Sequence, residues 1–377
     1  MKSRERVITT INHQEPDRIP LDLAGTTVTG LSAMTNVNLR KFLGLPADEH
    51  PGVAHVHQGL VWPQQDLLEF YDVDFRTVFM TKSPRGNVIT KNDDGSFYDE
   101  YNMLWKPGVY DYSPVTAPLS EAAIDDLKTA IWPDPTDPER ISGVSEQAAY
   151  YSEHTKYAVI ADIMCRGPFE LAVKLRSYEK LMTDFYLEPE FARALLEKIT
   201  DTVIKLWDSY LTAIDNRCQV VCQGDDLGMQ TSLIISPDLY RQFIKPCHKR
   251  IYDFIRSRTD ARIFMHSCGA IRDIIPDFIE IGVNILNPVQ RSATGMDIAK
   301  LKKEFGKDLV FWGGGIDTQL FLPTASLSEI EDDIKKTIDI MAPGGGFVFA
   351  PTHNLQPDIT PDRIDAVYKT VLKYGGY

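Results

Sequence analysis

The sequence predicts an α/β protein of the (β/α)8-barrel, or TIM-barrel, class with a β-hairpin inserted in its N-terminal half. From residue 157 to the end of the 377-residue chain, short apolar runs alternate with long amphipathic segments. This alternation indicates parallel strands joined by helices. Two earlier apolar runs bring the expected strands to eight, which closes a barrel. No Gly-x-Gly-x-x-Gly motif follows the first expected strand, which disfavours a dinucleotide-binding sheet. We expect one barrel domain over residues 1–377.

Local patterns define the individual elements. A first helix over residues 3–12 has Ser3 as its expected N-cap and an apolar face that contains Val7 and Ile11. The expected strands are short and apolar, at residues 19–23, 73–80, 157–164, 219–224, 262–267, 283–287, 309–312 and 346–350. The expected later helices are amphipathic, at residues 62–71, 189–214, 237–258, 271–281, 297–305, 327–341 and 361–373.

Residues 86–106 have a different pattern. Two β-type runs, at 88–90 and 97–105, flank a polar segment with the turn-forming pair Asp94-Gly95. We interpret this segment as an antiparallel hairpin that decorates the barrel.

Composition limits the class of partner and the compartment. The formal net charge of −13 argues against nucleic acid and anionic lipid as partners, because binding to either requires a basic face. The sequence contains neither an apolar run long enough to cross a membrane nor an N-terminal signal-peptide pattern, so we expect a cytoplasmic protein. The five cysteines have no disulfide-like spacing and are expected to be free thiols or metal ligands.

The strongest candidate site follows the expected strand at 262–267, which ends in His266-Ser267-Cys268-Gly269. TIM-barrel active sites lie at the carboxyl ends of the strands. His266 and Cys268 are two residues apart, so they share one strand face at a Cα separation of about 7 Å. An imidazole and a thiolate can bind one ion across that span, and this donor pair favours zinc. The alternative is a packed cysteine beside a hydrogen-bonded core histidine.

Further metal ligands are expected at other strand ends. His353 lies just past the last expected strand and is the preferred third ligand, whereas Cys222 lies within an apolar run and is expected in the core. His248 falls in a long helix and is expected to be structural. Asp225 and Asp226 follow the strand at 219–224, and two carboxylates in one dry site would raise the pKa of one and make it a general acid. They could instead bind zinc or substrate, cap a helix or be solvated.

Four residues are expected to contact substrate. Gly314 lies in a run of three glycines, which either exposes backbone amides to a ligand or makes a tight turn. His57 and Trp62 belong to an aromatic segment that could cover the mouth of the barrel. Asn354 follows His353 and is assigned to the same site.

Several segments together resemble the uroporphyrinogen decarboxylase superfamily, in particular its methyltransferase branch. They occur in the family's order along essentially the whole chain, at residues 4–7 with 12–20, and at 166–170, 236–240, 266–269, 313–317 and 350–354. True uroporphyrinogen decarboxylases carry an Arg-Gln-Ala-Gly-Arg-Tyr motif that binds the substrate's propionates. This chain has Leu23-Ala24-Gly25-Thr26-Thr27 in the comparable region, without those arginines. The resemblance therefore favours the methyltransferase branch.

In that branch a His-x-Cys pair and a later cysteine hold zinc, and methyl groups pass between small substrates or thiols and a corrinoid protein. The later cysteine lies in an Ala-Pro-Gly-Cys-Gly segment, which we match to residues 342–346, so that Gly345 replaces it. The resemblance then implies that zinc recruits His353 or a carboxylate and activates an oxygen or nitrogen of the substrate instead of a thiol.

The expected function is therefore a zinc-dependent methyltransferase that acts between a small methylated substrate and the corrinoid of a partner protein. A homodimer is expected from the resemblance alone. Two alternatives stay open: a metal-free decarboxylase that uses Asp225 or Asp226, and a non-catalytic ligand-binding barrel.

Overall fold

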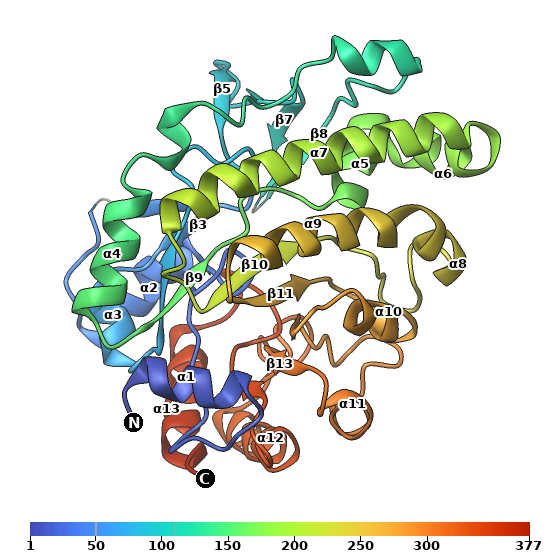
Figure 1. Cartoon of the computed structure of the whole chain (residues 1–377). Helices are drawn as coiled ribbons and strands as arrows, with labels where there is room; N and C mark the ends of the chain where they lie inside the picture. Colours follow the sequence, from blue (N-terminus) through green and yellow to red (C-terminus); the bar gives the residue numbers. More distant parts are fainter. Residues whose placement is uncertain (50, 110) are drawn as a thin grey trace.

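The computed structural model describes residues 1–49, 51–109 and 111–377, and its centre is a curled parallel sheet (Figure 1). The described part contains seven hydrogen-bonded parallel strands in this sheet, in the order β14-β13-β12-β11-β10-β9-β4. Their bounds are β4 Phe75–Val78, β9 Ala158–Ala161, β10 Val220–Gly224, β11 Arg262–His266, β12 Ile285–Asn287, β13 Val310–Trp312 and β14 Phe347–Val348. Each lies within a predicted strand, and the fold is TIM-barrel-like.

The predicted first strand, at residues 19–23, is an extended segment that connects the two edges of the sheet. Asp22 N donates to Phe349 O, just after β14, at 2.9 Å. Asp74 N, just before β4, donates to Leu21 O at 3.0 Å. These bonds join the segment to both edge strands, although its pairing is limited to a single parallel bridge between Leu21 and Phe349.

Two apolar layers hold the strands in place. One lies inside the curled sheet and contains alternate strand residues, among them Cys222, Phe264 and Trp312, with Val7 and Ile11 of the first helix. The other lies between the sheet and the surrounding helices. Because both faces of the sheet are covered, the strands are mostly apolar and do not alternate between apolar and polar residues, although Arg76 lies in β4 and the exposed Arg262 begins β11. Cys222 is fully buried in the inner layer, as expected of a core residue.

Helices surround the sheet, most of them on its outer side, while the first helix packs Val7 and Ile11 against the inner apolar layer (Figure 1). Their bounds are α1 Ser3–Ile11, α2 Ala33–Leu43, α3 Gln65–Phe70, α4 Val144–His154, α5 Pro168–Arg176, α6 Tyr178–Leu187, α7 Pro189–Ile214, α8 Pro237–Leu239, α9 Lys245–Arg258, α10 Ile275–Glu280, α11 Ile298–Phe305, α12 Leu327–Met341 and α13 Pro361–Tyr374. The predicted N-cap of α1 is wrong: Lys2 occupies that position, and Ser3 is buried in the first turn. No helix in the described ranges is both long and apolar enough to cross a membrane.

Two small antiparallel sheets lie in the N-terminal half. One is β1 Leu31–Ser32, β3 Leu60–Trp62 and β2 Gly52–His55. The other runs in the order β5 Val88–Lys91, β6 Phe97–Asp99, β7 Leu104–Pro107 and β8 Tyr112–Pro114. The predicted hairpin segment, 86–106, falls in this second sheet, which extends to residue 114. In Figure 1 its strands lie at the end of the molecule opposite α1 and the chain termini.

Candidate metal centre

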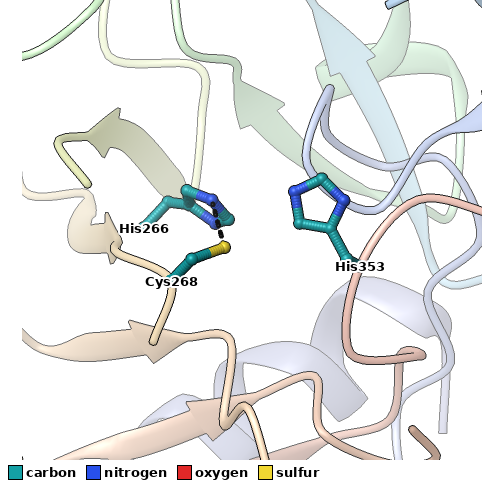
Figure 2. A group of neighbouring side chains, drawn as sticks. All are labelled: His266, Cys268 and His353. Carbon is teal, nitrogen blue, oxygen red and sulfur yellow. Dashed lines mark hydrogen bonds between the residues drawn. The ribbon is translucent and has the colours of Figure 1, made fainter. Parts of the chain in front are cut away.

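Three metal-binding side chains converge at the carboxyl ends of β11 and β14. The ligand atoms of His266, Cys268 and His353 all lie within 4.8 Å of one another. Figure 2 shows the side chains pointing toward one another from two segments of the chain. His266 Nε2 lies 3.5 Å from Cys268 Sγ. Two such ligands of a tetrahedral zinc ion are about 3.6 Å apart, so this pair is already spaced to share a metal ion.

The orientation of His266 is fixed by a hydrogen-bond chain that runs across two neighbouring strands. Asn287 Nδ2 donates to Trp312 O at 2.8 Å, which directs Asn287 Oδ1 toward His266 Nδ1 at 2.6 Å. Since that oxygen can only accept, His266 Nδ1 carries the proton and Nε2 keeps its lone pair. The lone pair lies on the side of Cys268. A fixed tautomer with the second nitrogen free is the usual arrangement of a metal-binding histidine.

Burial sets the protonation of the three ligands. It lowers the pKa of both His266 and His353, and the proximity of the two rings lowers the pKa of His353 further. Both imidazoles are therefore neutral near pH 7, which is the form that binds metal ions. Burial, with the nearby carboxylates of Asp226 and Glu170, raises the pKa of the Cys268 thiol well above its usual value. A divalent cation binds neutral imidazoles and would lower the pKa of the thiol, so the donor set fits a metal ion.

The two predicted catalytic aspartates occupy different environments. The Asp225 side chain is 0% exposed and its oxygens accept from Phe169 N at 2.9 Å, Glu170 N at 2.7 Å and His248 Nε2 at 2.8 Å. Asp225 therefore connects the N-terminus of α5 with α9, where His248 is its buried partner. Asp226 is 44% exposed, accepts from Cys268 N at 2.9 Å and lies 3.7 Å from His266 Nε2.

The match of Gly345 to the family's cysteine is wrong. Gly345 precedes β14, at the opposite end of that strand from His353, and a Cβ there would lie 2.3 Å from Gln14 O. A later Ala-Pro segment, at residues 350–354, leads into the three-residue cluster and has His353 in its fourth place. We therefore match His353, and not Gly345, to the cysteine in Ala-Pro-Gly-Cys-Gly.

A cavity of about 260 Å³ adjoins the cluster and is lined by both His266 and His353. His57 and Asp226 also line it. Trp62 lines a neighbouring cavity of about 220 Å³, and the two cavities share His55, Arg85 and Ile163.

The other two predicted contacts lie outside both cavities. Gly314 has a φ of 75°, and a Cβ there would lie 2.5 Å from Val289 O. The glycine therefore allows the backbone at this position to pass close to the backbone of Val289. Asn354 accepts from Gly30 N and donates to Gln58 Oε1, which joins two loops.

The sequence patterns did not identify the charged wall of the cavity, formed by Arg85, Arg166, Glu170 and Lys174. Arg166 and Glu170 lie in the Arg-Gly-Pro-Phe-Glu segment directly after a strand, which was a usable signal. Arg85 lies in a loop and Lys174 on α5, and neither has a local pattern that separates it from an ordinary surface cation.

The fold and site define a class: a TIM-barrel-like protein with a histidine–cysteine cluster at its strand ends. The family model of uroporphyrinogen decarboxylase (URO-D) matches residues 110–374, and the chain belongs to this family. The uroporphyrinogen decarboxylase of Bacillus cereus (strain B4264) is 23% identical over 303 residues, which cover 73% of this chain and 80% of that protein. The corresponding enzyme of Oceanobacillus iheyensis is 25% identical over 214 residues, 55% of this chain and 57% of that one.

Among solved structures, a methyltransferase from Methanosarcina mazei matches with a TM-score of 0.65 and 18% sequence identity over 99% of both chains. At this level of identity the match shows a shared fold over the whole chain.

Proposed function

We propose that this protein is a zinc-dependent methyltransferase that moves a methyl group between a small methylated substrate and the corrinoid of a partner protein. The observation that carries the proposal is the convergence of His266, Cys268 and His353 beside a cavity. Two imidazoles and one thiolate form a donor set that suits zinc rather than magnesium or calcium. Three protein ligands leave a fourth coordination position for substrate, as in catalytic zinc sites.

Bound zinc would supply Lewis acidity at the substrate heteroatom, which keeps the electron pair of the broken bond while the methyl carbon is transferred to the cobalt of the corrinoid. The chain's own residues prepare this step. Asn287 holds His266 with Nε2 directed at the cluster, and Asp226 anchors the backbone of Cys268. Trp105 and Tyr112 add aromatic surface to the lining of the cavity.

Metal-free decarboxylation by an aspartate is the second candidate, because the relatives in Bacillus cereus and Oceanobacillus iheyensis are named uroporphyrinogen decarboxylases. Asp225 is unsuited to this role since its oxygens are engaged by backbone amides and His248. The cavity of about 260 Å³ is also below the range of about 300–1,000 Å³ typical of drug-sized ligands, and a tetrapyrrole is larger still. These observations favour a small substrate. Enzymatic relatives and a convergent donor set likewise favour catalysis over a ligand-binding barrel.

The test is methyl transfer from methyl ethers, methylamines and methyl thioethers to free cob(I)alamin, catalysed by zinc-loaded protein. We expect Cys268→Ala to lower the rate at least about a hundredfold, because a metal ligand is lost. Cys218→Ala, a buried cysteine remote from the cluster, is the matched control and keeps the rate. Full methyl transfer by the Cys268→Ala protein, or carbon dioxide release that persists without metal, would contradict the proposal.

A further inference from the structure

Three cations line the same cavity as the metal cluster. Arg85 precedes β5, Arg166 follows β9, and Lys174 lies on α5. Arg166 Nε lies 3.0 Å from Glu170 Oε1, and Lys174 Nζ lies 3.8 Å from the same oxygen. Arg85 donates to Thr27 Oγ1 at 3.0 Å and forms no ion pair with any residue that the structure describes. Asp111 and Asp226 also line the cavity, but Glu170 is the carboxylate that pairs with Arg166 and Lys174, which leaves Arg85 as the cation without a carboxylate partner among the described residues.

The two adjoining cavities also concentrate unsatisfied polar atoms. In the described part of the chain, sixteen buried side-chain nitrogen and oxygen atoms have no hydrogen-bond partner. Seven of them belong to residues that line these cavities: both ring nitrogens of His55 and of His57, Trp62 Nε1, Arg85 Nε and Asp162 Oδ1. Buried polar atoms are normally paired with protein groups or with water, so this cluster marks a polar site that takes water or a polar ligand.

The cationic wall and His57 both lie against the ring of Trp105. Its ring lies 3.9 Å, centroid to centroid, from Trp105, and the Arg166 guanidinium lies 5.0 Å from the Trp105 ring. Burial, together with the charges of Arg166, Arg85 and Lys174, lowers the pKa of His57 to about 2. His57 is therefore neutral and adds no positive charge. A ligand here meets fixed cations beside a flat apolar face.

We propose that the substrate carries a carboxylate, held by Arg85, Arg166 and Lys174, while its methylated end reaches His266 and His353. This inference rests on the proposed methyl transfer. A guanidinium presents paired donors that match a carboxylate, and an ammonium adds a compact third charge. The small cavity restricts the substrate to a small organic acid.

The test uses two pairs of probes of nearly equal shape: 3-methoxybenzoate against 3-methoxybenzamide, and methoxyacetate against methoxyacetamide. Their affinities for the zinc-loaded protein are measured by calorimetry. In at least one pair we expect the acid to bind about tenfold more tightly than the amide, because a hydrogen bond to a charged group is stronger than a neutral one. Lys174→Met and Arg166→Gln should each weaken binding of the acid far more than binding of the amide, and so remove most of that preference. Lys128→Met, an exposed lysine outside the cavity, is the matched control.

The outcomes separate the two proposals. If neither acid is preferred, or if the preference survives both substitutions in folded protein, the carboxylate assignment is wrong. Zinc content is measured on the same samples. Protein that prefers the acid but binds no zinc contradicts the methyl transfer, whereas one zinc per chain without an acid preference contradicts only the carboxylate assignment.

Discussion

His266 Nδ1 lies 2.6 Å from Asn287 Oδ1, and this contact determines which ring nitrogen faces the cluster. Both residues are on neighbouring strands in direct register, so the sheet itself sets the distance between them. The amide in turn is held by Trp312 O. His266 Nε2 is thus oriented toward the cluster by contacts that run from β11 across the two neighbouring strands, β12 and β13.

We expect Asn287→Ala to weaken zinc binding by about 10–100-fold, because the His266 ring loses the acceptor that fixes its tautomer. Competition with a chromophoric chelator measures the affinity. Asn38→Ala, on an exposed face of α2, should have no effect. Unchanged affinity in the Asn287→Ala protein would show that the orientation of His266 does not depend on this contact.

The corrected match of the family's cysteine predicts opposite effects at two positions. His353→Cys should retain zinc binding, because the thiolate enters the place that the family's cysteine occupies, whereas His353→Ala should lose it. Gly345→Cys should bind no extra metal and should lower the free energy of unfolding by about 1–3 kcal/mol, since its φ of 71° and the nearby Gln14 backbone disfavour a side chain. Zinc content and urea denaturation test both positions. If the double variant Gly345→Cys/His353→Ala retained zinc, Gly345 and not His353 would match the family's cysteine.

Substitution of Asp225 should affect mainly the stability of the protein, and substitution of Asp226 mainly its activity. Asp225→Ala should lower the free energy of unfolding by about 3–5 kcal/mol, because it leaves His248 and two amides of α5 unpaired in the interior. Asp226→Ala, at a half-exposed position, should cost less than about 1 kcal/mol and should instead lower the methyl-transfer rate. Chemical denaturation and the transfer assay are run on both proteins. Equal losses of stability would contradict this division.

Asp162 should make stability depend on pH. Burial raises its pKa to about 6 from an ordinary value of 3.8, so the folded protein favours the protonated acid. Its contribution to stability is complete below pH 3.8 and is lost as the pH rises through about 6. Asp162→Asn should therefore stabilise the protein by about 2–3 kcal/mol at pH 8, with little gain at pH 4. Thermal unfolding at both values checks this, with the exposed Asp93→Asn as control. A gain of equal size at both pH values would argue against the raised pKa.

The parallel strands were predictable because they are buried on both faces and so form uninterrupted apolar runs bounded by amphipathic helices. The bounds of α7 follow from Pro189 and a continuous helical stripe. The position of His353 was predictable for the same reason, since it follows a strand. The structure of the segment at residues 19–23 was harder to predict, because its backbone hydrogen bonds go to both edge strands of the sheet. Arg85 and Lys174 could not be predicted, since their place in the cavity depends on the path of loops and on the rotation of α5.

X-ray absorption at the zinc edge of the purified protein tests the central claim most directly, because it counts sulfur and nitrogen neighbours of the metal. We predict one zinc per chain with one sulfur and two imidazole nitrogens, and the loss of the sulfur contribution in Cys268→Ser. A zinc content far below one per chain after zinc loading, or a coordination shell without sulfur, would contradict the assignment of His266, Cys268 and His353 as the metal centre.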